Sequence, residues 1–223
     1  MITARTAIVM LAVLSMPLIL SACNIAQVVE TVARPDPEVE ARHDIPDRTT
    51  VVLVDDPGSH VNPVRLRRDI ASSATDKLLQ RRTVTDMIDP RDAFQVARKL
   101  DQPGHPVSLD EIGRAVGASQ LIYIEVLGFG IKQGPQGLQP RADLRIKLID
   151  VDGRRRLFPA NDGQGGDHGA PLTVIIKPHE LQRIGVDKLQ EVQVELADRT
   201  GVAVARLFMN TKYGLDGEPL LGQ

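Results

Sequence analysis

The spacing of apolar and polar residues changes several times along the chain, and each change predicts an element. Thr49–Asp56 is a continuous β-branched, apolar run, which is typical of a strand buried on both faces. Asn62 can then cap a helix with Pro63 in its first position. Apolar side chains follow at every fourth position and predict an amphipathic helix that lies on a sheet. They are Leu66, Ile70, Ala74 and Leu78.

Three shorter elements are expected next. Thr83–Ile88 predicts a short strand, and a second helix is expected over residues 89–100. Ser108 and Glu111 form the S-x-x-E pattern of a capping box, so a third helix should begin there. This helix is expected to end at Gly117.

The second half of the chain predicts a meander of strands and a closing helix. Leu121–Ile131 is the strongest strand pattern in the chain, and long loops are expected around Gly128–Pro140. Ala142–Val151 alternates apolar and charged residues, so one face of this strand should be wet. Asp152-Gly153 is a hairpin signal. The remaining expectations are a glycine-rich loop at Asn161–Pro171, a strand at Leu172–Lys177, a short helix at Pro178–Leu181, and a long helix over Leu189–Phe208 with Gly201 as its weak point.

This order of elements predicts an α/β (α+β) fold: one domain with a mixed sheet of about five strands flanked by helices. We expect the domain to span 49–213 and the last residues, 214–223, to be a disordered tail. Residues 23–48 contain three prolines and few periodic apolar positions, so they predict an extended tether.

The first residues predict a secretory signal. A single charge, Arg5, precedes the apolar run Thr6–Leu20, which is too short to span a bilayer comfortably, since about 20 apolar residues are needed. The run leads into Leu20-Ser21-Ala22-Cys23, and Cys23 is the one cysteine of the chain. These four residues resemble the lipobox of bacterial lipoproteins. The resemblance implies a signal peptide over 1–22, cleavage between Ala22 and Cys23, and acylation of Cys23, the lipidation site.

Composition excludes several kinds of partner. The net charge is −2, and it becomes −3 when residues 1–22 are removed, so no polyanion is favoured. Aromatic residues make up 3% of the chain and tryptophan is absent, which leaves few rings for stacking on bases or sugars. We therefore expect no nucleic-acid partner.

Few residues suggest chemistry. The Asp55–His60 loop places Asp, Ser and His directly after a strand, where open α/β sheets bind ligands. It suggests a hydrolytic site, although neighbouring residues rarely form a nucleophile–base chain and a turn is the favoured interpretation. Asp162, Asp167 and His168 could hold a cation, but a solvated loop is favoured. Arg154-Arg155-Arg156 could meet lipid headgroups or phosphate, and a solvated strand end is the favoured alternative. We therefore expect no catalytic residue, metal or cofactor.

Two segments carry a second resemblance. Gly113, Val116, Gly117, Ala118 and Leu121 follow the pattern G-x-x-V-G-A-x-x-L, and a strand then closes on Asp150-x-x-Gly153. The strand contributes Leu144, Ile146, Leu148 and Ile149. Together with the first strand, residues 49–155 resemble the small α/β domain of a lipoprotein group. That group holds the curli-secretion lipoprotein, the activator lipoprotein of penicillin-binding proteins and the amino-terminal domain of the Tol translocation protein.

These observations predict a non-enzymatic lipoprotein of the cell envelope. It would be held to the membrane by acylated Cys23, face the periplasm, and serve as a scaffold, activator or assembly factor for another envelope protein, with homo-oligomers possible. Asn24 is not the aspartate that tends to retain enterobacterial lipoproteins at the inner membrane, so the outer membrane is favoured. Two alternatives stay open: a subunit of an outer-membrane secretion pore, which the charged outward face of residues 141–157 disfavours, and an envelope hydrolase that uses the Asp55–His60 loop.

Overall fold

The structure is a computed structural model that describes residues 38–101, 107–134, 137–160, 168–177, 180–181 and 188–212. One compact unit extends from Glu40 to Asn210. Outside this unit, two short strands, β1 (Glu38–Val39) and β7 (Thr211–Lys212), pair antiparallel with each other. Residues 1–37 and 213–223 lie outside the described part of the chain, and so do the expected signal peptide, Cys23 and the tail.

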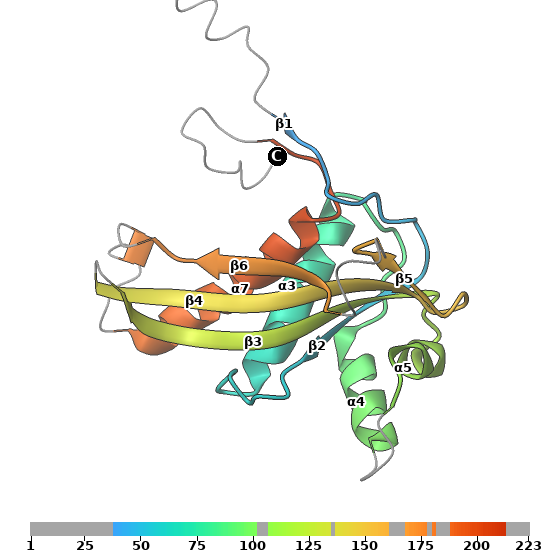
Figure 1. Ribbon diagram of the computed structural model, residues 1–223, viewed down its shortest axis with the longest axis horizontal. Coiled ribbons are helices and arrows are strands. Elements are labelled where there is room, and N and C mark those ends of the chain that lie inside the picture. Colours follow the sequence, from blue (N-terminus) through green and yellow to red (C-terminus); the bar gives the residue numbers. More distant parts are fainter. Residues whose placement is uncertain are drawn as a thin grey trace, which may run out of the picture. The chain divides into compact units, whose positions relative to one another are not determined.

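The compact unit is built on a mixed sheet, as predicted (Figure 1). β2 (Thr50–Asp55) pairs parallel with β3 (Gln120–Gly134), and β3 pairs antiparallel with β4 (Gly137–Asp150). The other edge of β4 pairs with both β5 (Arg155–Phe158) and β6 (Ala170–Ile175). The fold class, an α+β domain with a five-stranded mixed sheet, is confirmed in the described part of the chain.

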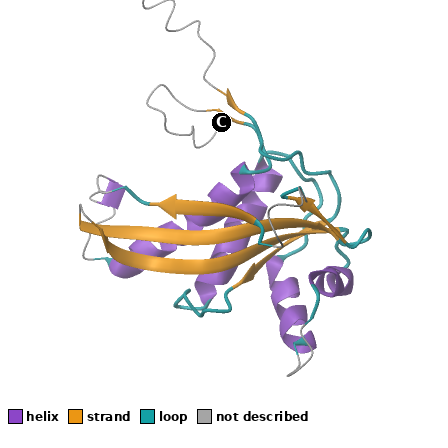
Figure 2. Ribbon diagram, viewed as in Figure 1, coloured by secondary structure: helices purple, strands orange, loops and turns teal. Residues whose placement is uncertain are grey.

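Two long helices cover one face of this sheet (Figure 2). They are α3 (Arg65–Gln80) and α7 (Leu189–Arg206), and the alternate residues of β2, β3 and β4 that point toward them form the main core. The predicted stripe of α3 is buried as expected, with Leu66, Ile70, Ala74 and Leu78 all at 0% exposure. This burial, rather than helix propensity, holds the two helices on the sheet.

The second face of the sheet is covered over only part of its length. Two shorter helices, α4 (Pro90–Leu100) and α5 (Leu109–Val116), pack there on Val51, Leu53 and Leu121. The capping box of Ser108 and Glu111 is present, and Gly117 ends α5 with a φ of 80°. Both predictions for this helix are therefore confirmed.

The chain before β2 also belongs to the compact unit. Ile45 is buried in the main core, and the backbone N–H groups of Arg42 and His43 donate to the carbonyl oxygen of Leu207 at 2.9 and 3.1 Å. The last residues of the expected tether, 40–48, are therefore packed against the folded unit.

Two predicted elements near the start of the domain are wrong. Residues 83–88 form no strand, and Met87 makes only an isolated bridge with Thr50. Within this described segment, the backbone bonds to β2 are limited to Thr50, whose N–H donates to the Asp86 carbonyl at 2.9 Å and whose carbonyl accepts the Ile88 N–H at 2.8 Å, and the Thr85 N–H donates to the Asp47 carboxylate at 2.8 Å instead of to a strand. Asn62 does not cap α3 either, because the helix begins later, at Arg65, and no side chain caps it.

Two predictions in the second half are also wrong. The segment Gly128–Pro140 is not a set of long loops, because β3 and β4 continue in register to Gly134 and Gly137. Gly201 is not a weak point of the last helix, since α7 passes through it without a break. β6 also begins at Ala170, inside the expected glycine-rich loop.

Candidate functional surfaces

The Asp55–His60 loop is organised by Asp56, whose side chain is buried. Its carboxylate accepts the backbone N–H groups of His60 and Val61 at 2.8 and 2.9 Å, and it pairs with Arg67 at 3.0 Å. Ser59 and His60 are exposed. The aspartate that would orient a catalytic histidine is therefore occupied in holding the turn, and the hydrolase interpretation gains no support from this geometry.

Asp55 is occupied as well. The Tyr123 hydroxyl donates to its carboxylate at 2.7 Å, and the Lys147 ammonium lies 5.9 Å from the centre of the Tyr123 ring. Burial, together with the hydrogen bond to Asp55, raises the pKa of Tyr123 above its usual value. This tyrosine stays protonated at physiological pH and acts as a hydrogen-bond donor.

No metal site is seen among the residues that the structure describes. Of the candidate cation ligands, His168 is exposed, and Asp162 and Asp167 lie outside the described residues. Within the same described ranges, no helix is long and apolar enough to cross a membrane.

The glycines of the matched motif have separate physical roles. A Cβ at Gly113 would lie 2.4 Å from a methyl group of Val151, so this glycine lets α5 approach the end of β4. Gly117 has a left-handed φ of 80°, which favours glycine, and a Cβ there would meet nothing within 4 Å. The first glycine is required by packing and the second by backbone conformation.

Asp150 and Gly153 close the turn after β4. The Gly153 backbone N–H donates to the Asp150 carboxylate at 3.1 Å, and a Cβ at Gly153 would lie 2.6 Å from the same group. The hydrogen bond from Gly153, with the neighbouring Arg155 and Arg48, lowers the pKa of Asp150 below its usual value of 3.8. The D-x-x-G pattern is therefore a turn built on a buried carboxylate.

An arginine cluster surrounds this turn. We use this name for Arg48, Arg114, Arg154 and Arg155. Arg48 and Arg155 pair with Asp150 at 3.6 and 3.2 Å. Arg114 and Arg154 pair with Asp110 at 2.7 and 3.6 Å. Four guanidinium groups thus share two carboxylates at this end of the sheet.

The opposite end of β4 forms a second surface, the hairpin end, which comprises residues 127–134 of β3 and 137–141 of β4. β2 stops where Asp55 pairs with Glu125, so no described strand pairs with this part of β3 on that side. Large apolar side chains are exposed on this hairpin, on β6, which pairs with β4 from Arg141 onward, and on α7, which also contacts β4. They are Leu127 at 41%, Leu138 at 41%, Ile175 at 38%, Leu189 at 53% and Val194 at 41%.

Between these two ends, the uncovered part of the second face is polar. Arg141 holds Asp143 through two contacts of 2.8 and 2.7 Å, and the Thr173 hydroxyl donates to the same carboxylate at 2.9 Å. The hydrogen bond from Arg141 is the main reason why the pKa of Asp143 lies below its usual value. Arg141 and Thr173 thus hold the Asp143 carboxylate in structural contacts.

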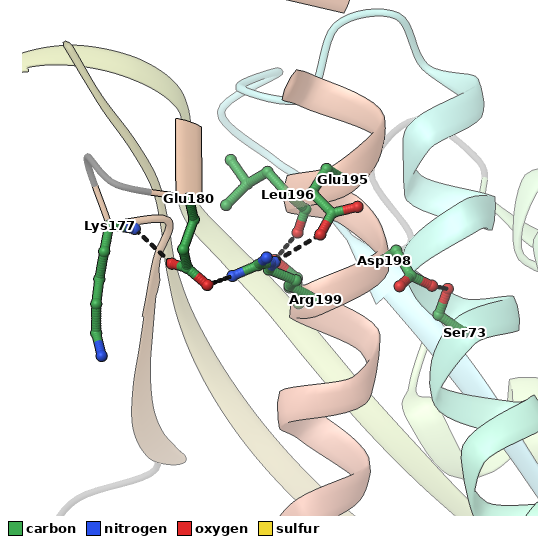
Figure 3. A network of polar contacts seen from close by, with 8 residues as sticks. Ser73, Lys177, Glu180, Glu195, Leu196, Asp198 and Arg199 are labelled. Atoms are coloured by element: carbon green, nitrogen blue, oxygen red, sulfur yellow. Dashed lines mark hydrogen bonds and ion pairs between the residues drawn. The ribbon is translucent and has the colours of Figure 1, made fainter. Parts of the chain in front are cut away.

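A polar network fastens α7 to its neighbours (Figure 3). Arg199 bonds Glu195 on the same helix at 2.7 Å and also pairs with Glu180, which in turn accepts the backbone N–H of Lys177 at 2.8 Å. On the other side of α7, the Ser73 hydroxyl donates to Asp198 at 2.7 Å. These contacts link the segment after β6 and the helix α3 to α7, which is a structural role.

No family model and no curated protein matches this sequence. Among solved structures, the chain is similar to the PelC dodecamer from Paraburkholderia phytofirmans at 15% identity and a TM-score of 0.43, over 78% of this chain and 93% of that one. It is also similar to lipoprotein GNA1162 from Neisseria meningitidis at 12% identity and a TM-score of 0.37, over 68% and 94% of the two chains. The chain is also similar to the C-terminal domain of LpoB from Salmonella enterica, at 12% identity and a TM-score of 0.35, over 61% of this chain and 87% of that one. The likeness is distant. It assigns no role to this chain.

Sequence reasoning missed most of these groupings. The arginine run at 154–156 is visible in the sequence, but Asp110, which pairs with Arg154, lies more than forty residues away, and no local pattern indicates the pairing. The hairpin end did leave a signal, because Phe129 and Ile131 alternate with glycines as a strand requires. Both residues lie in the strand predicted over Leu121–Ile131, which is confirmed as part of β3, but the long loops expected around Gly128–Pro140 overlapped it.

Proposed function

We propose that this chain is a lipoprotein anchored to the cell envelope through acylated Cys23, and that it acts without catalysis on another envelope protein. The pattern Leu20-Ser21-Ala22-Cys23, after a short apolar run, is the observation that carries this proposal. One acyl chain gives only marginal membrane binding, so the two or three chains of a lipoprotein are what would hold the protein at the membrane. The protein would face the periplasm, with the outer membrane favoured over the inner one.

A non-catalytic role is supported by how the described residues use their polar groups. Asp56 holds a turn, Asp55 receives the Tyr123 hydroxyl, and Asp143 is held by Arg141. Each of these three carboxylates is thus occupied by a structural partner. We therefore expect the function of this part of the chain to depend on binding through its surface, and a scaffold, activator or assembly factor fits this best.

The hairpin end is the surface we assign to the partner protein. Its exposed leucines and the unpaired side of β3 are features of protein-binding surfaces. An exposed strand edge offers backbone hydrogen bonds, and neighbouring apolar side chains add contact area. This surface overlaps Gly128–Pro140, where long loops are expected from the sequence, but it is strand rather than loop.

The anchor is tested by growing cells with labelled palmitate. The wild-type protein should carry the label and begin at Cys23, whereas Cys23→Ser should be unlabelled and retain its signal peptide. An unlabelled wild-type protein, or a mature terminus elsewhere, would contradict the proposal.

The partner surface is tested by photo-crosslinking in cells. A photoreactive residue at Leu127 or Leu138 should give a crosslinked protein, while the same residue at Gln80 or Gln95, exposed on α3 and α4, should not. Equal crosslinking from all four positions would remove the assignment of the hairpin end.

The two alternatives make different predictions. A secretion-pore subunit should form ring-shaped oligomers that conduct ions across bilayers after extraction in detergent. A hydrolase that uses the Asp55–His60 loop should lose its cellular function in Ser59→Ala, whereas our proposal expects no loss.

A further inference from the structure

The carboxylates and the guanidinium groups of the arginine cluster differ in their exposure to solvent. The carboxylates at its centre are shielded from solvent, with the side chain of Asp150 at 6% exposure and that of Asp110 at 21%. The guanidinium-bearing side chains are much more open, at 67% for Arg154 and 70% for Arg155. Solvent therefore meets the guanidinium groups, while the two carboxylates that pair with them are more shielded.

Within its ion pairs, the cluster has more guanidinium groups than carboxylates. Four arginines share two carboxylates, which leaves two charges uncompensated within the ion-paired group. Asp152, exposed on the same turn, and the nearby Glu111 lie outside these ion pairs and together balance the two remaining charges; Glu111 keeps its negative charge although its carboxylate accepts the Ser108 backbone N–H at 3.1 Å. The feature that distinguishes the cluster is therefore its outward-facing guanidinium groups rather than a net charge. Arginine is the side chain best suited to phosphate, because its planar fork of donors matches the phosphate oxygens and it is weakly hydrated.

The number of residues between Cys23 and the compact unit limits how far this cluster can lie from the proposed membrane anchor. Sixteen residues separate Cys23 from Glu40, the first residue of the compact unit, and a chain of that length spans at most about 60 Å in any conformation. A tethered group meets the surface at a high effective concentration, so even a weak contact is populated. Arg48 follows the entry of the chain into the unit by eight residues.

We propose that the arginine cluster rests on the anionic phospholipid headgroups of the membrane leaflet that holds the acyl chains of Cys23. This inference rests on the proposed anchor and deepens it by giving the folded unit an orientation. The cluster lies at one end of β4 and the hairpin end at the other, and a strand of 14 residues is about 45 Å long. With the arginines on the lipid, the hairpin end points away from the membrane toward the partner.

The contact is measured with the acylated full chain reconstituted in vesicles. A dye is placed on Ala115→Cys, exposed on α5 beside the cluster, or on Gln133→Cys at the hairpin end, and energy transfer to headgroup-linked acceptors reports the distance to the membrane. Vesicles of phosphatidylcholine are compared with vesicles that also contain phosphatidylglycerol. Transfer from position 115 should rise with phosphatidylglycerol and fall with added salt, and transfer from position 133 should stay low.

The variant Arg154→Gln/Arg155→Gln should lose this rise. Each arginine near an anionic surface contributes enough for the pair to change the contact equilibrium about tenfold to thirtyfold. The matched control, Arg65→Gln/Arg68→Gln, removes two exposed arginines from α3 and should behave as wild type. Unchanged thermal unfolding of both variants would show that the turn still folds.

Three results would overturn the proposal: equal transfer in both kinds of vesicle, an unchanged response in the Arg154→Gln/Arg155→Gln variant, or a response lost equally in the control. Loss of the rise on adding inorganic phosphate, but not chloride at the same ionic strength, would indicate a phosphate-ion site and would also count against it. A protein that does not float with vesicles at all would instead refute the anchor, so the two failures can be told apart.

Discussion

Gly201 is expected to be the most size-sensitive position on α7. A Cβ at this position would lie 2.4 Å from the carbonyl oxygen of Ile70, 2.6 Å from the Cβ of Ser73 and 2.8 Å from the backbone nitrogen of Ala74. Contacts between such atoms are normally about 3.5 Å. The two helices would therefore have to separate by about 1 Å to accept even a methyl group, and rigid helix backbone cannot turn aside as a side chain can.

Two opposing effects set the cost of Gly201→Ala. Overpacking of a core costs about 1–3 kcal/mol, and the backbone contacts place this site at the upper end. Alanine in place of glycine within a helix raises the free energy of unfolding by about 1 kcal/mol through its higher helix propensity. We therefore expect a net loss of about 2 kcal/mol, which corresponds to a fall in Tm of about 4–8 °C for a unit of this size.

The assay is urea unfolding followed by far-UV circular dichroism, since the chain has no tryptophan. Gly117 gives the matched control, because a Cβ there meets open space but the φ of 80° disfavours any L residue. The loss in free energy of unfolding should be larger for Gly201→Val than for Gly201→Ala, whereas Gly117→Ala and Gly117→Gln should lower it by the same amount. A neutral or stabilising Gly201→Ala, as helix propensity alone would give, would refute the close approach of α3 and α7.

Three further predictions follow from the described contacts and the lipobox. Asp56→Asn leaves Arg67 without its buried counter-charge and should lower the free energy of unfolding by about 3 kcal/mol in the same urea assay; a loss below measurement would contradict the assigned role. Because the folded pKa of Asp150 is lowered, its contribution to stability should be complete above the usual pKa of 3.8 and disappear as pH falls below it. Asp150→Asn should therefore be less stable than wild type at neutral pH and closer to it in acid, and a pH-independent difference would argue against the Gly153 hydrogen bond. Cys23→Ser should lose flotation with membranes that wild type shows, and flotation unchanged would mean that something other than acyl chains holds the protein.

Local patterns determined the elements that depend on near neighbours. The stripe of α3, the capping box at Ser108 and the end of α5 at Gly117 all appear where the sequence placed them. Each depends on residues within a few positions of one another, so spacing alone was sufficient. The strand predicted over residues 83–88 did not form, because its only backbone bonds to β2 among the described residues are those of Asp86 and Ile88 with Thr50, and the Thr85 N–H bonds the side chain of Asp47 from a distant segment.

The proposed surfaces depended on contacts that spacing cannot show. Nothing local says that Asp110 would lie under Arg154, or that β2 would stop at Asp55 and leave the rest of β3 without a neighbour on that side. Gly201 is the clearest case. Helix propensity considers only the helix that contains the residue, so it predicts that Gly201 weakens α7. In the structure the missing side chain instead allows α3 to pack closely against α7.

The sequence by itself determined the fold class and the main helices, since these depend on short periods and on residues close together in the chain. The tertiary structure alone decided that charge gathers at one end of β4 and exposed apolar groups at the other. The physical reason is that a strand or helix sets which residues share a face, but only the packing of separate elements sets which faces meet.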